Sequence, residues 1–400
     1  MSKKSPWCLK PVALAAIALL AAPPIRGQAS SPSRPPSLAT LEAAAQRDSL
    51  DADALFQLAV AYDLAKRYDD AERVARQAVA VDPRDAQAWL LLASLPYDRR
   101  SKLWKEVRRD QVPPEWRQAV EESDRFEHRA FLLDPLVDFR VRGTPPPKED
   151  VLEIRDYGQE TTDYLLELGL GAFGWRYLLS YSALDLYAER QYKGQAVDSI
   201  PSGLLWWRGL AAAHVNAHRH AIADIQLLLN RALKHEASDS LIQITLGTED
   251  FQYLLGLLQE RAGHTADAIT FYQAALATNI GLYMAHVRLA RLYASHKMWD
   301  AAIEEAQRAE TANPDDPTTL LDLAAILRDA GHTADAQDAL RRAQAANPRN
   351  PRVPYELGLV ELQLGQSAEA KTAFTRFLAI APSRMGSEIN DAKQRLAGLP

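Results

Sequence analysis

The 400-residue sequence has one cysteine, Cys8, and only 18 glycines against 23 prolines. Cys8 precedes the first apolar run, so it cannot be the lipid-bearing cysteine of a lipoprotein, which would follow that run. With no other cysteine, the chain can form no internal disulfide and no cysteine-based metal site. β-branched residues are sparse over long stretches, whereas Ala and Leu dominate the apolar residues, and this favours helix over sheet.

Catalytic signatures are also missing. The sequence contains no G-x-S-x-G nucleophile elbow and no H-E-x-x-H metal motif. Gly169-Leu170-Gly171-Ala172-Phe173-Gly174 has the glycine spacing of a dinucleotide-binding turn, which requires a buried strand before it. Asp163 and Glu167, four residues apart, instead favour a solvated helix there. We therefore expect no enzymatic activity and no cofactor.

The only long apolar run with basic residues before it lies at the N-terminus. Lys3, Lys4 and Lys10 precede the run 11–22, and the small residues Gly27 and Ala29 follow it. This is the layout of a secretory signal peptide, and a 12-residue run is too short to span a bilayer. We expect cleavage after residue 29 and a periplasmic or secreted protein that does not span the membrane.

The charge of the expected mature chain is acidic. Residues 1–29 contain four of the 46 basic residues and no acidic ones, so the remainder has 42 basic and 52 acidic residues. A net charge of −10 does not favour nucleic acid or an anionic membrane surface as a partner. We expect a protein or peptide partner, and the sequence leaves the oligomeric state open.

Residues 249–382 repeat with a period of 34. One column contains leucine and the next a small residue, a third contains alanine, and a fourth contains the proline that ends each unit. The four columns are Leu255, Leu289, Leu323 and Leu357; Gly256, Ala290, Ala324 and Gly358; Ala268, Ala302, Ala336 and Ala370; and, for the last three units, Pro314, Pro348 and Pro382. The columns predict two short antiparallel helices per unit, with small residues that allow close packing. One such pair cannot bury its apolar face alone, so neighbouring units must stack.

This pattern resembles the tetratricopeptide repeat family, whose Leu-Gly, Ala and terminal Pro signature the columns match over four units without insertion. The resemblance implies an all-α fold, an alpha-alpha solenoid (superhelix) of helical hairpins. Further units fit at 52–85 and, less regularly, at 202–235. We expect this domain order: a signal peptide at 1–29, a flexible leader at 30–45, an N-terminal repeat block at 46–142 with an insertion at 95–117, an irregular aromatic-rich helical segment at 143–201, a repeat block at 202–382 and a capping helix at 383–400.

In such solenoids the first helix of each unit lines a concave groove that receives a segment of a partner protein. The resemblance therefore implies a scaffold for protein–protein interaction, with a role in envelope or export assembly suggested by the expected location. By register, the groove would present Tyr253, Leu257, Met284, Val287, Arg291, Leu321, Arg328, Tyr355 and Leu359. The same side chains could instead pack between repeats. Where chaperone-binding members carry an asparagine, this sequence has Leu257, Arg291, Ala325 and Leu359, which makes a carboxylate-clamp partner doubtful.

Two alternative functions stay open. The aromatic residues between 157 and 207 could stack on sugars, as in a carbohydrate-binding accessory protein, or could pack the irregular helices. They are Tyr157, Tyr164, Phe173, Trp175, Tyr177, Tyr181, Tyr187, Tyr192, Trp206 and Trp207. The cluster His214, His218 and His220 has the spacing of a metal site, but a repeat over 202–235 would place a turn near Asn216 and separate the histidines.

Overall fold

The structure, a computed structural model, describes residues 36–99, 114–137, 165–166, 168–169, 177–234, 246–314 and 316–399. Within these ranges it contains seventeen α-helices, one short 3₁₀ helix and no strand. The predicted all-α fold is confirmed, and successive helices pack as antiparallel hairpins in an alpha solenoid.

The N-terminal part, residues 36–137, is called the N-arm. Its helices are α1 (Leu38–Arg47), α2 (Ala52–Leu64), α3 (Tyr68–Val81), α4 (Ala86–Arg99) and α6 (Pro114–Leu133). Buried residues such as Phe56, Val74 and Leu91 join α1 to α4 in one hydrophobic core, on which Phe126 of α6 also packs. The N-arm thus has a core made only of its own residues.

The second part, residues 177–399, is called the C-arm. It contains α8 (Tyr177–Tyr192), η2 (Val197–Ser199), α9 (Ser202–His214), α10 (His218–Leu233), α11 (Thr248–Arg261), α12 (Thr265–Thr278), α13 (Tyr283–Ser295), α14 (Trp299–Ala312), α15 (Thr318–Asp329), α16 (Thr333–Ala346), α17 (Arg352–Gln363), α18 (Ser367–Ile380) and α19 (Gly386–Gly398). Each helix from α8 to α19 packs on the next one along the chain, so the C-arm is one continuous solenoid.

Small residues and left-handed turns make the hairpins. A Cβ atom at Gly256 would lie 2.5 Å from the Tyr272 ring, and one at Gly358 would lie 2.6 Å from Phe374, so only glycine lets these helices approach so closely. The turn inside each hairpin needs one residue with positive φ. Three hairpins of the C-arm use glycine there, whereas the α13–α14 hairpin uses Lys297 at φ 59°.

Two expectations need correction. Residues 38–45 were expected in a flexible leader, but they form most of α1, because Ser37 caps the helix through Thr40 and Leu38, Leu41 and Ala45 pack on the N-arm core. The insertion expected at 95–117 is shorter, since α4 continues to Arg99 and α6 begins at Pro114; residues 100–113 lie outside the described ranges.

The C-terminal helix α19 covers the end of the solenoid. Met385 and Ala392 are buried in a cluster with Phe374 and Phe377, while Leu396 packs at its edge. The opposite side of α19 is polar and meets water. Such a helix closes the apolar face that a last repeat would otherwise expose.

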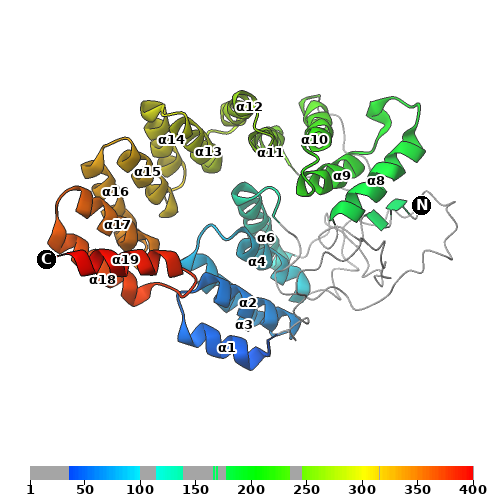
Figure 1. Ribbon diagram of the computed structural model, residues 1–400. Helices are drawn as coiled ribbons and strands as arrows, with labels where there is room; N and C mark the ends of the chain where they lie inside the picture. Colours follow the sequence, from blue (N-terminus) through cyan, green and yellow to red (C-terminus); the bar gives the residue numbers. More distant parts are fainter. Residues whose placement is uncertain are drawn as a thin grey trace, which may run out of the picture.

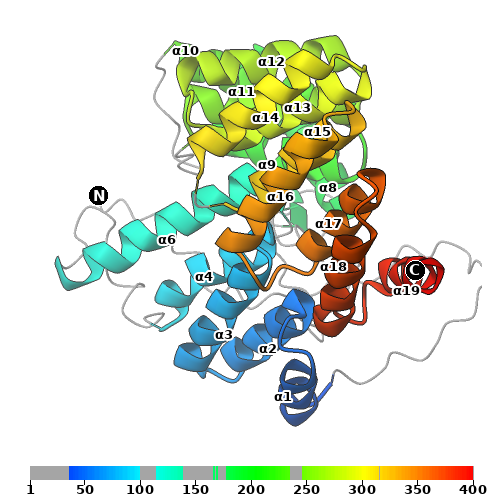
Figure 2. The same cartoon turned by 90° about the vertical axis from the view of Figure 1, so that its left-hand side faces the viewer.

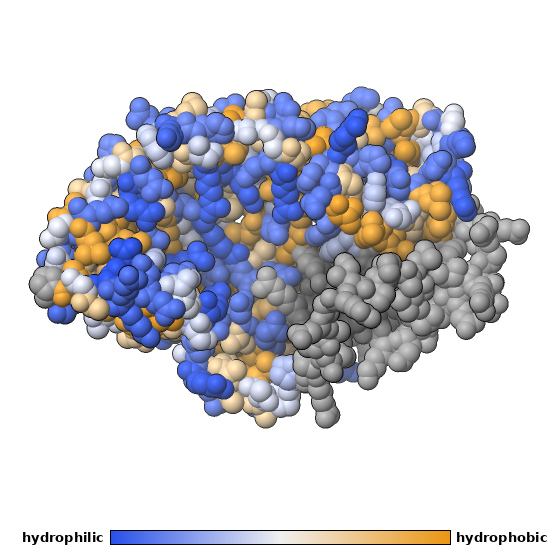
Figure 3. All heavy atoms as spheres, viewed as in Figure 1, coloured by the Kyte–Doolittle hydropathy of each residue, from blue (hydrophilic) through white to orange (hydrophobic). Residues whose placement is uncertain are grey.

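The two arms are packed against each other. The C-arm curves from α8 to α19 as an arc, and the N-arm lies inside that arc, with α4 and α6 nearest α11 (Figures 1 and 2). The first helices of the hairpins, α11, α13, α15 and α17, form the inner side of the arc, and their partners form the outer side (Figure 1). Hydrophilic residues dominate the visible outer surface of the arc (Figure 3).

Candidate functional site

The inner side of the C-arm contains all nine residues predicted for the partner-binding groove. They come from four consecutive first helices: Tyr253 and Leu257 on α11, Met284, Val287 and Arg291 on α13, Leu321 and Arg328 on α15, and Tyr355 and Leu359 on α17. The nine fall into two groups that differ in what covers them.

The apolar residues of α11 and α13 are buried. Tyr253, Leu257, Met284 and Val287 are each less than 5% exposed. Met284 and Val287 share a hydrophobic cluster, here called the inter-arm cluster, with Trp89 and other residues of the N-arm. These four side chains therefore pack inside the closed molecule and present no surface to water.

Tyr253 makes the most specific of these contacts. Its hydroxyl donates a hydrogen bond of 2.7 Å to the carbonyl oxygen of Leu132, and its ring meets Phe131 edge-on with centroids 6.4 Å apart. Complete burial raises the pKa of the Tyr253 phenol, so it stays a donor. Beside it, His128 of α6 lies 3.1 Å from Asp250 of α11.

The inner side from α13 to α19 carries polar contacts between successive inner helices. Arg291 Nη2 lies 2.8 Å from Asp322 Oδ1, Arg328 pairs with Glu356, and the Tyr355 hydroxyl donates a 3.0 Å hydrogen bond to Asp391 of α19. Burial, followed by that hydrogen bond, raises the pKa of Tyr355 to about 12. These contacts form a polar ladder along α13, α15, α17 and α19.

Leu321 and Leu359 complete this second half. Both are partly exposed; Leu321 packs on the core between α13 and α17, and Leu359 packs near α19. The α15–α17 half therefore combines partly buried leucines with charged groups, whereas the apolar residues of the α11–α13 half lie under the N-arm.

Sequence reasoning missed the residue of the N-arm that reaches deepest into the polar ladder. Arg84, in the turn between α3 and α4, places Nη2 2.5 Å from Asp322 Oδ2 and Nε 3.9 Å from Asp316 Oδ2. Asp316 is 1% exposed and accepts a hydrogen bond from the Thr318 amide. Although burial alone lowers it, the two carboxylates raise the pKa of Arg84, so the guanidinium stays charged. No local pattern in the sequence links a turn near residue 84 with acids near 320.

Several polar atoms at this interface are buried without a hydrogen-bond partner among the described residues. They include Tyr283 Oη, Arg129 Nε, Asp316 Oδ2, Asp322 Oδ2 and both Nε and Nη2 of Arg84. The Arg129 guanidinium lies over the Trp89 ring at 4.6 Å, and burial raises the pKa of Tyr283. Buried polar atoms without partners carry a desolvation cost, so the contact between the arms is less well satisfied than a typical core.

Comparison with known proteins identifies the repeat. Residues 253–317 and 321–384 match one family model described as tetratricopeptide repeat, and residues 37–95 match a second with the same description. The chain belongs to the tetratricopeptide repeat family. Proteins of this family bind other proteins, so the chain is a scaffold for protein–protein interaction.

Solved structures of other tetratricopeptide repeat proteins are similar over part of the chain. The C-terminal part of a repeat-containing protein from Cytophaga hutchinsonii is 13% identical with a TM-score of 0.46, covering 58% of this chain and 84% of that one. MamA 41-end from Desulfovibrio magneticus RS-1 is 16% identical with a TM-score of 0.37, covering 45% of this chain and 94% of that one. No curated protein matches the chain.

The predicted histidine cluster falls on the turn between α9 and α10. His214 ends α9 and His218 begins α10, with Asn216 between them at φ 59°. The His214 ring stacks on Tyr177 with centroids 3.7 Å apart, and His220 contacts the Tyr181 hydroxyl. In the described part of the chain, no group of three or more His, Cys, Asp or Glu side chains could hold a metal ion.

Of the aromatic segment, Tyr157, Tyr164, Phe173 and Trp175 lie outside the described residues, as do Gly171 and Gly174 of the glycine-rich stretch. Tyr187 is 7% exposed and meets Tyr192 edge-on, and Trp206 packs edge-on against Phe251 of α11. These rings pack the start of the solenoid, which leaves them less free surface for a sugar.

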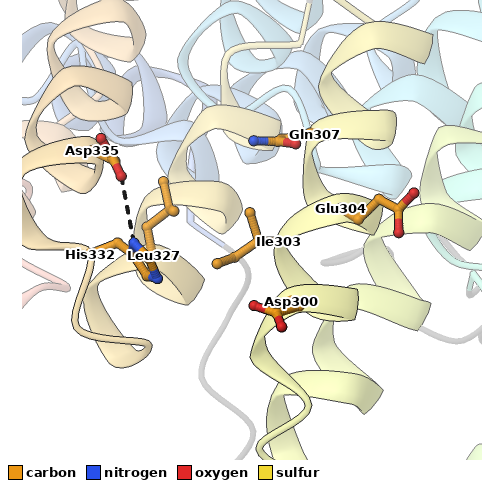
Figure 4. Close-up of a pocket in the computed structure, with 7 residues that line it drawn as sticks. All are labelled: Asp300, Ile303, Glu304, Gln307, Leu327, His332 and Asp335. Atoms are coloured by element: carbon orange, nitrogen blue, oxygen red, sulfur yellow. Dashed lines mark ion pairs between the residues drawn. The ribbon is translucent and has the colours of Figure 1, made fainter.

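A cavity of about 360 Å³ lies on the outer side of the C-arm, between α14 and α16 (Figure 4). Its lining residues are Asp300, Ile303, Glu304, Gln307, Leu327, His332 and Asp335. The acids in it do not converge, since Asp335 lies 3.7 Å from His332 while Glu304 pairs with Arg308 at 2.5 Å. The cavity thus offers no preorganised binding group.

Among the described residues, no helix combines the length and the hydrophobicity needed to cross a membrane.

Proposed function

We propose that the chain is an exported, non-enzymatic scaffold that binds a segment of a partner protein on the inner side of α15 and α17. What carries the proposal is the difference between the two halves of the concave face. The α11–α13 half is buried under the N-arm, while Leu321 and Leu359 stay partly exposed beside the paired charges of Arg328 and Glu356.

This surface suits a particular kind of segment. The exposed parts of Leu321 and Leu359 provide apolar contact for hydrophobic anchors of an extended or helical peptide. Arg291 is 51% exposed at the edge of the polar ladder, so it can also pair with an acidic residue beside those anchors. An amphipathic segment with an acidic flank fits both features.

In-cell photo-crosslinking tests the surface. A photoreactive amino acid at Leu321 or Leu359 should give one dominant protein adduct, which Arg328→Glu should abolish. Reactive residues at Ile280 and Met298, which are 77% and 52% exposed away from the inner side, are matched controls. Equal adducts at the control positions, or none at Leu321 and Leu359 in a folded protein, would refute the proposed surface.

Export is supported by the charged and apolar layout of residues 1–29, which lie outside the described ranges. The proposed role in envelope or export assembly follows from this expected export. Mass spectrometry of the protein purified from its native cell should find an N-terminus near residue 30. A chain that keeps Met1 would contradict export by cleavage.

A further inference from the structure

We propose that the N-arm is a displaceable intramolecular ligand of the concave face, so that the structure is an autoinhibited form of the scaffold. With the N-arm in place, Tyr253, Met284 and Val287 are closed to a partner; when it swings out, the binding surface extends from α15–α17 to α11. The displacement of the N-arm stands on the geometry below, and only its effect on a partner rests on the proposed function.

Each arm can keep its own core when the two separate. The N-arm core joins α1, α2, α3, α4 and α6, and every one of its residues lies between Leu38 and Phe126. The C-arm core from α13 to α18 likewise contains no residue of the N-arm. Rigid units with separate cores move relative to one another by default unless a large apolar interface joins them.

The inter-arm cluster is the main apolar contact between these units. Against Tyr253, Met284 and their neighbours in the C-arm, the N-arm contributes seven residues: Ala86, Trp89, Leu90, Phe131, Leu132, Leu133 and Val137. Leu136 adds a contact near Leu257. These residues lie at the start of α4, at the end of α6 and just after it, while the helices of the N-arm pack mainly on each other.

Apart from the contact of Arg84 with Asp322, the polar contacts away from that cluster are long or exposed. Arg261 lies 3.9 Å from Asp134, and Arg384, before α19, lies 3.5 Å from Asp51 and 3.6 Å from Asp53. Ion pairs of this kind contribute little to stability in water. These ion pairs favour the closed arrangement of the arms but stabilise it only weakly.

The arginine contact combines charge complementarity with incomplete pairing. Arg84 sits between Asp322 and the almost fully buried Asp316, whose second oxygen has no hydrogen-bond partner among the described residues. Tyr283 Oη and Arg129 Nε are also buried without a hydrogen-bond partner among the described residues. Opening the arms would return these atoms to water, which offsets part of the apolar area lost.

The closed form also shows what chemistry can displace the N-arm. The N-arm presents an arginine directly before helix α4 and the aromatic Trp89 within that helix's first turns, beside the aliphatic Leu132 and Leu133. A competing segment would be a helix with an arginine at its N-terminal end, for Asp316 and Asp322, followed by an aromatic residue for the cluster around Met284.

Pulsed electron spin resonance on the full chain tests the displacement. Cys8→Ser removes the native thiol, and Leu64→Cys on the N-arm with Met298→Cys on the C-arm provides two exposed label positions, 58% and 52% exposed. We expect one narrow distance in this background. Arg84→Glu, which puts a carboxylate against Asp316 and Asp322, should add a longer and broader population.

Arg73→Glu is the matched control, because Arg73 is an N-arm arginine that pairs with Asp70 on its own helix. It should keep the narrow distance. Hydrogen exchange gives a second readout: amides of α13 should exchange about tenfold faster in Arg84→Glu, with unchanged helical content, and less so in the milder Arg84→Ala.

Three results would overturn the proposal. An unchanged narrow distance and unchanged exchange in both Arg84 variants would make the arms one rigid body. A broad distance before mutation would mean that the N-arm does not occupy the concave face. A narrow distance between singly labelled chains in a mixture would show that a second copy supplies the occupant. Photo-crosslinked adducts at Leu321 together with arms that do not move would refute only this proposal. Arms that move, without any adduct at Leu321, would refute only the proposed function.

Discussion

Two kinds of interface hold this chain together, and they are built differently. Within the C-arm, small residues allow the closest helix contacts: Ala290, Ala302 and Ala336 are fully buried, and Gly358 leaves room for the Phe374 ring. Between the arms, the contact is made by large side chains, Trp89 and Tyr253, and by the guanidinium of Arg84. Small residues give close, uniform helix packing, while large ones join surfaces of different origin through a few anchors.

The difference extends to buried polar groups. Inside the C-arm, His286 Nδ1 lies 2.6 Å from Glu305 Oε2, and His286 Nε2 lies 3.3 Å from the carbonyl oxygen of Ile280, which accepts. Arg308 pairs with the same Glu305 carboxylate at 2.5 Å. At the inter-arm contact, Asp316 Oδ2 has no hydrogen-bond partner among the described residues and lies 3.9 Å from Arg84 Nε. The repeats thus form the permanent structure, and the inter-arm contact is the part that can change.

The largest effect should come from breaking the buried pair inside the repeats. His286→Leu leaves Glu305 buried with one partner fewer, and we expect the free energy of unfolding to fall by about 3 kcal/mol. Chemical denaturation followed by circular dichroism measures it. His332→Leu, at a histidine whose side chain is 53% exposed, should change it by less than about 0.5 kcal/mol. Equal losses in the two variants would contradict the assigned role of the pair.

The pH dependence of that pair has a definite sign. Burial alone would raise the pKa of Glu305, but the hydrogen bond from His286 and the charge of Arg308 outweigh it and lower the pKa overall. Since the folded-state pKa is depressed, the contribution is present above the ordinary glutamate value of about 4.3 and is lost as pH falls through the folded-state value. The stability gap between the wild type and Glu305→Gln should therefore narrow on acidification.

A smaller loss should follow from filling the close approach between α17 and α18. Gly358→Ala places a Cβ 2.6 Å from the Phe374 ring, so the helices must separate. We expect the free energy of unfolding to fall by about 2 kcal/mol. Gly398→Ala is the control, since a Cβ there meets nothing within 4 Å. An unchanged midpoint for Gly358→Ala would show that this packing is looser than described.

One substitution, Lys297→Gly, should increase the stability of the protein. Lys297 holds φ 59° in the turn where three other hairpins of the C-arm have Gly263, Gly331 and Gly365. Since left-handed backbone costs a residue with a Cβ about 1 kcal/mol, Lys297→Gly should raise the free energy of unfolding by up to that amount. Lys297→Ala keeps the strain and should be nearly neutral. A loss of stability on Lys297→Gly would mean that the lysine side chain itself supports the turn.

The smallest effect concerns the pH response of the inter-arm contact. A hydrogen bond to Asp250 raises the pKa of His128 in the closed form, and Glu249 acts in the same direction. Because that pKa is raised, protonated His128 favours closure below its ordinary value of about 6.5, and this contribution is lost as pH rises through the closed-form value. Raising the pH from below about 6.5 to above the closed-form pKa of His128 should increase the population of chains with separated arms roughly threefold.

His128→Gln should flatten this response in the same spin-label measurement. His264→Gln is a suitable control, because His264 bonds Gln259 within the C-arm and does not touch the N-arm. A pH response that survives in His128→Gln would assign it to another group.

The repeats could be predicted because their information is local. Each hairpin depends on residues within one 34-residue unit, such as Gly256 against Tyr272, so the columns of leucine, small residue and proline mark the units of the C-arm. The sequence does not predict helix α1, because the proline-rich stretch before it is typical of a flexible leader. Ser37 is nevertheless an ordinary helix cap.

The inter-arm contact could not be predicted in the same way. Arg84 and Asp322 belong to turns and helices that each look complete alone, and no periodicity links them. The nine residues assigned to the groove by register all lie on the inner helices, yet register says nothing of what fills the space before them. That depends on where a second block of repeats folds back, which is a property of the whole chain.

The fold-back has a consequence for how such a chain can change length. The N-arm touches successive points of the C-arm: Asp250 on α11, Asp322 on α15, Asn347 after α16, which donates to the Ala80 carbonyl at 3.1 Å, and Arg384 before α19. An open solenoid gains or loses a repeat at little cost because each unit meets only its neighbours. Here a duplicated or deleted unit would shift every later contact with the N-arm by one step of the superhelix. The contacting residues of the two arms would then no longer lie opposite each other. Repeat number in the C-arm is therefore tied to the span of the N-arm.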